Sequence, residues 1–290
     1  MKSKVLINYA ILCFIWGTTW IILKKSLIEG TPPFFGSGFR FFVSGIILWC
    51  IIFYKKERVP THPLHIRLYI QFGIMNLTIA YGLTYWATQF IYSSLSSIIW
   101  AGFPLCVAVF TYFMLPNELF TKRKIISLLL GTLGVLLILK ESLKFEGDHV
   151  GFGILMVMLA VVIAVYPNVY LKKHSEVVSS LHLNAVSQIM AGIILLFVSF
   201  IFEKDQQMVW SNYNIFALGY LTIFGSLIAW YIYFWLFPQI SISQISYIAF
   251  FAPVLASILG WIILDERLSI LAIFGGGFVI LGAVLVNLNE

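Results

Sequence analysis

The sequence predicts an all-α polytopic membrane protein with ten transmembrane helices, arranged as two inverted five-helix repeats. Three observations lead to this prediction: an apolar composition, ten apolar segments of spanning length, and a pattern that occurs twice. Of the 290 residues, 61% are hydrophobic and only 10% are charged, whereas soluble proteins carry about 25% charged residues. A water-soluble core cannot bury this much apolar surface, so we expect most of the chain to lie in a lipid bilayer.

Ten apolar segments, separated by short polar connections, approach the length of about 20 residues that a helix needs to cross a bilayer. Prolines and paired basic residues mark several of their boundaries. The fifth segment is the shortest. The expected spans are residues 5–23, 34–54, 68–87, 93–115, 125–139, 151–171, 183–202, 215–237, 243–264 and 270–288.

A repeated pattern divides the chain into halves. Residues 94–104 and residues 243–253 both carry serine at the first and fourth positions and proline at the eleventh. Repeats of this kind dictate the architecture of a chain. We therefore expect a first five-helix repeat over residues 1–140 and a second over residues 141–290.

The number of helices in each half sets how the halves are related. Five is odd, so the second half must cross the membrane upside down relative to the first. Glu118 and Glu266 are equivalent in the two halves, and they should therefore lie on opposite membrane surfaces. Inverted repeats recur in secondary transporters, where a site at their interface can be opened to either side.

The basic residues predict the orientation in the cell membrane. With the N-terminus inside, eleven Lys and Arg residues fall on the cytoplasmic side and six on the opposite side, which predicts cytoplasmic N- and C-termini. The formal net charge of +6 then reflects loops beside anionic lipid headgroups, and not a nucleic-acid-binding surface. The three cysteines all lie in apolar runs, so neither a disulfide nor a metal site is expected.

Short motifs in both halves carry a family resemblance. They are Trp16-Gly-Thr-Thr-Trp20, Pro33, Phe39-Arg40-Phe41, Phe103-Pro104-Leu105, Gly225-Ser226, Ala252-Pro253-Val254 and Leu264-Asp-Glu-Arg-Leu268. Together they resemble the EamA type of the drug/metabolite transporter (DMT) superfamily over essentially the whole chain. The resemblance implies a ten-helix inner-membrane carrier whose members commonly export amino acids or other small metabolites. One departure is that residues 115–119, the first-half counterpart of residues 264–268, keep the acid and lack the arginine.

Arg40 is the only charged residue well inside an apolar run. An ionisable group at that depth suggests a function, here the binding of a substrate carboxylate. A structural role is the alternative, because a long arginine can reach headgroups or helix-end carbonyls. The family resemblance also makes Arg40 look like a structural position.

Aromatic and hydroxyl side chains recur at helical spacing in the third, fourth and eighth spans. Tyr81 and Trp230 are equivalent in the repeat, so both halves place an aromatic ring at the same depth. Aromatic walls with a few hydroxyls suit an amphipathic organic solute. The alternative is helix packing, and for Tyr81 and Trp100 both interpretations remain open.

Two asparagines within the spans, Asn76 and Asn168, should face the bundle interior, because an unpartnered amide is costly in lipid. Their partner is either the substrate or another helix. The candidate substrate-binding residues are Trp16, Thr19, Arg40, Asn76, Tyr81, Ser97, Trp100, Tyr166, Asn168, Trp230, Ser246 and Tyr247.

Prolines and glycines within the expected spans are candidates for hinges and for close helix contacts. Pro104, Pro167 and Pro253 interrupt the helical ladder and are candidate hinges, with a static kink as the alternative. Glycines near residues 131–134 and 275–282 favour close helix contacts in a scaffold or a homodimer.

The residue types that the expected spans lack exclude several functions. No Asp, Glu or His lies deep in any expected span, so proton coupling through a buried carboxylate is not expected. The spans contain no paired catalytic groups, which disfavours an intramembrane enzyme, and no cofactor is expected. We expect a carrier that exports small amphipathic metabolites, such as amino acids, by alternating access, either uncoupled or by exchange. A carrier for cationic or hydrophobic drugs is the alternative.

Overall fold

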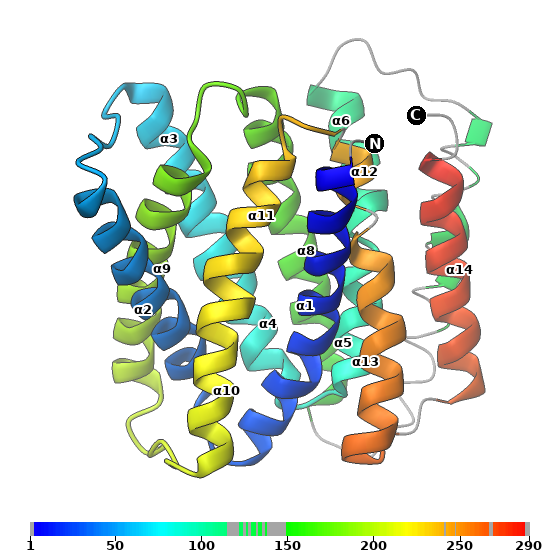
Figure 1. Cartoon of the computed structure of the whole chain (residues 1–290). Helices are drawn as coiled ribbons and strands as arrows, with labels where there is room; N and C mark the ends of the chain where they lie inside the picture. The colour runs from blue at the N-terminus through cyan, green and yellow to red at the C-terminus, as the bar shows by residue number, and fades with distance from the viewer. Residues whose placement is uncertain are drawn as a thin grey trace.

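The computed structural model describes residues 3–114, 122–123, 126, 129–131, 133–134, 137, 149–240, 242–246, 248–266 and 269–287. Within these ranges every regular element is a helix, which confirms the predicted all-α class, and the helices stand side by side in one bundle (Figure 1). The elements are α1 (Ser3–Ile28), α2 (Pro33–Tyr54), α3 (Pro63–Gln71), η1 (Phe72–Ala80), α4 (Tyr81–Thr88), α5 (Ser93–Trp100), α6 (Phe103–Met114), α8 (Val150–Lys173), α9 (Ser180–Phe202), α10 (Asn212–Thr222), η2 (Ile223–Ile228), α11 (Ala229–Leu236), α12 (Ile242–Ser246), α13 (Ile248–Leu264) and α14 (Ile270–Asn287).

Seven helical stretches within the described residues are long and apolar enough to cross a bilayer, as expected of a multi-pass membrane protein. They correspond to the first, second, fourth, sixth, seventh, eighth and ninth expected spans. The third span is helical throughout, as α3, η1 and α4, and the tenth is α14. The fifth span lies largely outside the described residues, as does Glu118, so its predicted position relative to Glu266 stays a prediction.

The first helices of the two halves run in opposite directions. In Figure 1, α1 runs away from the end of the bundle at which both termini lie, whereas α8 runs toward that end. The contacts agree, because the end of α1 and the start of α8 both meet the last turn of α4. Lys24 of α1 bonds the carbonyl of Thr88 there, and Gly153 of α8 lies against the carbonyl of Ala87.

Among the described residues, three spans depart from a regular α-helix near their middle. The third and eighth each contain a π-helical segment, over residues 72–80 and 223–228, at corresponding positions of the two halves. A π-helical turn is wider than an α-helical one and occurs often at functional sites. The fourth span breaks at residues 101–102, between α5 and α6.

The three candidate hinge prolines occupy different settings. Pro104 lies in the first turn of α6, where a proline is well tolerated because its missing N–H has no helical partner to lose. Pro167 and Pro253 lie inside α8 and α13. The structure thus makes Pro104 the start of a helix, and bending at the other two stays a prediction.

The closest helix packing is between α2 and α9. Three glycines on this interface leave no room for a side chain. A Cβ added to Gly38 would lie 2.8 Å from the backbone nitrogen of Leu196, and one added to Gly45 would lie 2.8 Å from that of Ile189. One added to Gly192 would overlap the backbone of α2. A second close contact joins Gly134 to α14, consistent with the predicted scaffold role of the glycines.

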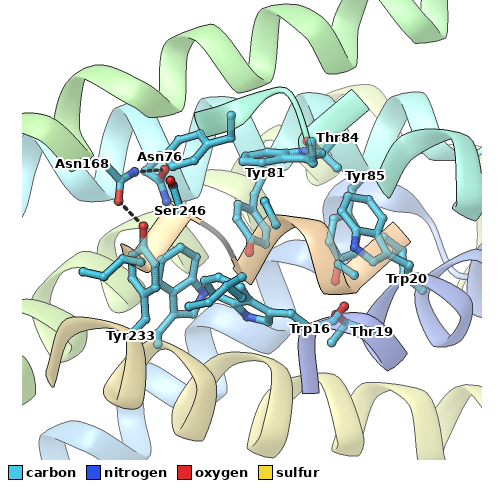
Figure 2. A pocket seen from close by; sticks show the side chains of 18 of the residues that line it. Trp16, Thr19, Trp20, Asn76, Tyr81, Thr84, Tyr85, Asn168, Tyr233 and Ser246 are labelled. Atoms are coloured by element: carbon cyan, nitrogen blue, oxygen red, sulfur yellow. Dashed lines mark hydrogen bonds between the residues drawn. The ribbon is translucent and has the colours of Figure 1, made fainter. Parts of the chain in front are cut away.

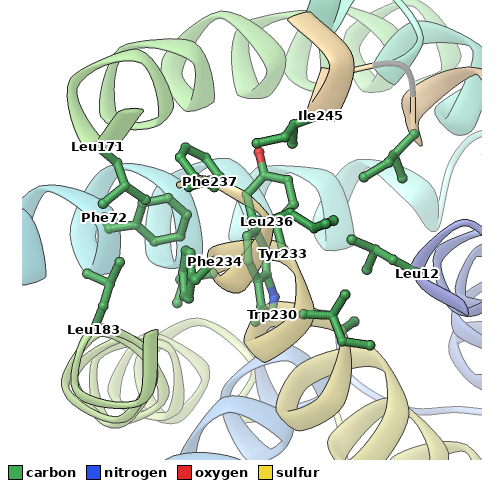
Figure 3. Packing of buried hydrophobic residues seen from close by; sticks show 14 of the residues in the cluster. Leu12, Phe72, Leu171, Leu183, Trp230, Tyr233, Phe234, Leu236, Phe237 and Ile245 are labelled. Atoms are coloured by element: carbon green, nitrogen blue, oxygen red, sulfur yellow. The ribbon is translucent and has the colours of Figure 1, made fainter. Parts of the chain in front are cut away.

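Buried aromatic side chains form the centre of the largest apolar cluster. Trp230, Tyr233 and Phe234 of α11 pack with Phe72 of η1 (Figure 3). The ring centroids of Phe72 and Phe234 are 4.8 Å apart. This cluster joins the third span to the eighth, because it packs the first π-helical segment against α11.

Two buried glutamates cap helices of the other half. Glu203, just after α9, accepts hydrogen bonds from the backbone N–H groups of Phe34 and Phe35 at 2.7 and 2.9 Å, at the start of α2. Glu266, just after α13, accepts bonds from Ser93 and Ser94 at the start of α5. Helix N-termini leave N–H groups unpaired and favour anions. The two carboxylates therefore tie the second half of the chain to the first.

Two lysines make the complementary contact at helix C-termini. The Nζ of Lys24 donates to the carbonyls of Thr88 and Gln89, at 2.8 and 3.1 Å. In the second half, Lys172 donates to the carbonyls of Phe237 and Ile240. A cation at a helix C-terminus satisfies carbonyls that have no partner within the helix. Each lysine thus joins the first helix of its own half to the end of the third.

Candidate functional site

A cavity lies at the centre of the bundle, among helices of both halves. It encloses an empty volume of about 910 Å³, part of which is open to the surroundings. Eight of its lining residues are aromatic, and Figure 2 shows several of them facing one another across the cavity. The lining residues are Trp16, Thr19, Trp20, Leu23, Arg40, Asn76, Tyr81, Thr84, Tyr85, Trp100, Phe103, Asn168, Trp230, Tyr233, Ile245, Ser246, Ile248, Ala249 and Ala252.

The structure brings most of the predicted binding residues to this cavity. Those that line it are Trp16, Thr19, Arg40, Asn76, Tyr81, Trp100, Asn168, Trp230 and Ser246. Ser97 does not line this cavity: it is fully buried and donates its hydroxyl to the carbonyl of Ser94 at 2.7 Å. Tyr166 does not line the cavity either: it stacks on Tyr170 and meets Gln71 of α3. Tyr247 lies outside the described residues.

Aromatic rings from three spans form one wall of the cavity. Trp230 of α11 is at its centre: the ring centroids of Trp16, Tyr81 and Tyr233 lie 5.4, 5.6 and 5.2 Å from it. Edge and tilted contacts at these distances stabilise a fixed ring arrangement. The Nε1 of Trp100 donates to the hydroxyl of Thr84 at 3.2 Å, so Trp100 contributes a ring face more than a hydrogen-bond donor.

Arg40 forms a cationic corner of the cavity. Its guanidinium donates to the hydroxyls of Ser226 and Tyr85 and to the carbonyl of Gly225, each at 2.6 Å. These neutral partners fix the side chain against η2 and α4, which is the structural role foreseen as the alternative. None of them neutralises the charge. Arg40 therefore joins the two halves and also leaves a positive charge beside the cavity.

Three side chains form a hydrogen-bonded chain across the two halves. The hydroxyl of Tyr233 donates to Oδ1 of Asn168 at 2.7 Å, and Nδ2 of Asn168 donates to Oδ1 of Asn76 at 3.1 Å (Figure 2). The partner of each asparagine, left open by the sequence, is thus another helix. Asn76 belongs to the π-helical η1, Asn168 follows the proline of α8, and Tyr233 belongs to α11.

The cavity wall presents hydrogen-bond donors that have no partner. Among the described residues, the buried Nε1 atoms of Trp16 and Trp230 and the Nδ2 atom of Asn76 make no hydrogen bond within the protein. Every buried unpartnered polar atom on the described part of the wall is thus an N–H donor. A buried donor without a partner costs about 1–3 kcal/mol, and a bound solute with acceptor groups would remove this cost.

Four prominent lining residues were not among the predicted binding set: Trp20, Thr84, Tyr85 and Tyr233. Helical spacing supplied a signal for each of them. Trp20 follows Trp16 by four residues, and the others lie three or four residues beyond Tyr81 or Trp230. Tyr85 and Tyr233 lie on the same helical stripes as Tyr81 and Trp230, and extending the stripes by three or four residues also reaches Trp20 and Thr84.

The described lining residues include no acid–base pair suited to catalysis. None of the described lining residues is Asp, Glu or His, and the described part of the chain holds no group of three or more His, Cys, Asp or Glu residues that could bind a metal. The arrangement is suited to enclosing an amphipathic solute, with rings around its apolar part and N–H groups toward its acceptor atoms.

Comparisons with known proteins agree with this chemistry. The EamA-like transporter family matches the chain twice, over residues 4–140 and 151–288. The uncharacterized transporter YoaV of Bacillus subtilis is 31% identical, with 98% of this chain and 94% of that protein aligned. The S-adenosylmethionine/S-adenosylhomocysteine transporter of Chlamydia muridarum is 29% identical, with 96% and 89% aligned.

A solved crystal structure has the same fold, with a TM-score of 0.73 at 18% identity over 99% of both chains. The family and the names of the relatives point to transport, and not to an enzyme, as the sequence predicted. The chain therefore belongs to the EamA-like transporter family of the drug/metabolite transporter superfamily.

Proposed function

We propose that this protein is a secondary carrier of the cell (inner) membrane that exports small amphipathic metabolites with an acceptor group, such as amino acids, by alternating access. The observation that carries the proposal is the composition of the cavity wall. Rings surround the space, and the buried polar atoms without partners are the N–H donors of Trp16, Trp230 and Asn76. A carboxylate or carbonyl of a solute would satisfy such donors.

Alternating access rests on the two halves, residues 1–140 and 141–290, acting as inverted repeats. Three features support this arrangement. The helices α1 and α8 run in opposite directions, π-helical segments occupy corresponding positions, and Lys24 and Lys172 make the same kind of contact in each half. The candidate binding residues come from both halves, which supports a site at their interface that a rocking motion would open to either side.

The charge of the cavity discriminates between the two classes of solute. Arg40 is buried there without an acid among the described lining residues. A cationic drug would meet this charge unfavourably, although the rings could offer it cation–π contacts. An anionic or zwitterionic solute is attracted, so the proposal favours metabolites over cationic drugs. The absence of a lining carboxylate in the described wall also supports uncoupled transport or exchange.

Orientation is the second part of the proposal. The excess of basic residues on one side supports cytoplasmic termini, and both termini lie at the same end of the bundle in Figure 1. Cysteine accessibility labelling of variants with single cysteines near residue 30 and residue 58 would test it in intact cells. Labelling near residue 30 and protection near residue 58 is expected, and the reverse would overturn the orientation.

Counterflow in proteoliposomes tests the function. Purified protein is reconstituted, loaded with unlabelled solute, and assayed for uptake of the labelled form across the amino acids, with and without a proton gradient. We expect exchange of at least one amino acid, with a rate that the gradient leaves unchanged. Failure to exchange any solute would overturn the proposal, whereas acceleration by the gradient would overturn only its uncoupled part.

A pair of related solutes tests which solute charge the cavity prefers. S-adenosylmethionine and S-adenosylhomocysteine differ by one methyl group and the positive charge that it creates on sulfur, and the name of the Chlamydia relative recommends both. If the charge of Arg40 dominates, S-adenosylhomocysteine should compete for uptake at least as well as S-adenosylmethionine. A strong preference for the charged sulfonium would favour the cation–π alternative instead.

A further inference from the structure

The orientation of one buried amide is fixed by the backbone of its own helix. Nδ2 of Asn168 lies 2.7 Å from the carbonyl oxygen of Ala164. If this amide were reversed, two acceptor oxygens would face one another without a proton between them, in a site that excludes water. The hydroxyl of Tyr233, which can donate to Oδ1 of Asn168 at 2.7 Å, fits the same orientation. Asn168 therefore has only one favourable orientation.

Asn168 in turn fixes the amide of Asn76. Its Nδ2 lies 3.1 Å from Oδ1 of Asn76, and a reversed Asn76 would place two NH₂ groups against each other. Asn76 must therefore turn its own Nδ2 away from Asn168. That nitrogen is buried and has no partner among the described residues, and Asn76 lines the cavity. Asn76 is 2% exposed in this conformation, so its unpartnered Nδ2 has little contact with solvent.

We propose that Asn76 donates a hydrogen bond from Nδ2 to an acceptor oxygen of the transported solute, and that Asn168 is a positioning residue that holds Asn76 in the donor orientation. The carbonyl of Ala164, Asn168 and Asn76 form a chain in which each amide sets the next. A backbone carbonyl cannot reverse its polarity, so the cavity always presents a donor at this point. The proposal rests on the proposed function and adds to it the group that selects acceptor-bearing solutes.

Two substitutions reverse or remove the donor. In Asn168→Asp, the ionised carboxylate can only accept. It loses the bond to the carbonyl of Ala164, and Asn76 should turn to donate to Asp and present Oδ1 to the cavity. In Asn76→Asp, the cavity gains an acceptor directly, without any change at Asn168. Both variants keep the size of the side chain. Because hydrogen bonds to charged groups contribute about 1.5–3 kcal/mol, each variant should lower the relative affinity for a carboxylate by about tenfold or more.

The readout is a ratio of affinities for two solutes of similar shape, 3-phenylpropanoate, which carries only an acceptor, and phenethylamine, which carries only a donor. Binding is measured by the fluorescence of the cavity tryptophans in detergent, and counterflow is measured in parallel. The wild type should prefer 3-phenylpropanoate, and both variants should lose this preference. Thr78→Val is the matched control, because Thr78 is a buried residue of η1 that bonds the carbonyl of Gly73 and does not line the cavity.

The outcomes separate the positioning role from the function. An affinity ratio in Asn168→Asp equal to that of the wild type would overturn the positioning role, whether both affinities stay the same or both fall by the same factor. If the wild type binds neither solute, the donor proposal is also overturned. Binding with the expected ratios but without counterflow would leave the donor chain supported and would overturn transport.

Discussion

Replacing Glu266 by glutamine should destabilise the protein through one helix N-terminus. The carboxylate accepts bonds from the backbone N–H groups of Ser93 and Ser94 at 2.8 and 3.2 Å, and from both serine hydroxyls at 2.8–2.9 Å. A glutamine keeps one acceptor oxygen and turns an NH₂ group toward the other backbone N–H. The hydroxyls can rotate to accept, but the backbone N–H cannot.

The expected cost follows from these contacts. One buried N–H loses its partner, which costs about 1–3 kcal/mol, and the helix N-terminus loses its anion, which costs roughly another 1 kcal/mol. We therefore expect Glu266→Gln to lower the free energy of unfolding by about 2–4 kcal/mol. Titration of the detergent-solubilised protein with sodium dodecyl sulfate, followed by circular dichroism and tryptophan fluorescence, measures this change. Glu176→Gln is the exposed control and should change it by less than about 0.5 kcal/mol.

A double-mutant cycle decides whether the serines are the partners. Ser94→Ala should cost clearly less in the Glu266→Gln background than in the wild type, because the two side chains share one interaction. Additive costs would refute the proposed capping, since the glutamate would then act through some other contact. An unfolding free energy equal to that of the wild type would refute the reasoning altogether.

Two further predictions concern helix packing and the cavity wall. Gly192→Ala should lower the free energy of unfolding by about 1–3 kcal/mol, because the new Cβ would overlap the backbone of Phe42 and force α2 and α9 apart. Gly219→Ala, where nothing lies within 4 Å of the added Cβ, should instead gain about 0.5–1 kcal/mol, and the opposite order would contradict the packing. Trp100→Ala should reduce transport about tenfold or more at equal protein in the membrane, since removing a central aromatic contact costs about 2 kcal/mol. Flux at the wild-type level would assign Trp100 to packing alone.

The helical spacing of aromatic and polar residues predicted many of the residues that line the cavity. Tyr81 and Trp230 were expected at equal depth from their equivalent positions, and both line it with ring centroids 5.6 Å apart. The prediction succeeds because a membrane helix turns its more polar side toward the bundle interior, and residues spaced three or four apart lie on one side of a helix. Ser97 was expected on such a stripe but does not line the cavity. Its hydroxyl bonds the carbonyl of Ser94 within the same turn, a local contact that helical spacing does not reveal.

Long-range partners were beyond the reach of the sequence. The hydroxyl of Ser226 and the phenol of Tyr85 lie far along the chain from Arg40, and each is one of many polar groups that could have met the guanidinium. The same holds for Glu266, whose position after α13 marks it as a helix-end residue without naming Ser93 as its partner. The π-helical segments have no distinctive composition, so they too appear only in the structure.

The glutamate caps have a consequence for how the protein is made. Phe34 and Ser93 precede their acceptors Glu203 and Glu266 by 169 and 173 residues. At about 5–20 residues per second, a ribosome delivers each acceptor roughly 10–35 s after the helix that needs it. The lysine contacts, in contrast, join helices of one half and can form as soon as that half has been inserted. The N–H groups at the starts of α2 and α5 therefore lack their acceptors until the second half has been synthesised. We expect the first half alone to be less stable and to bind membrane chaperones.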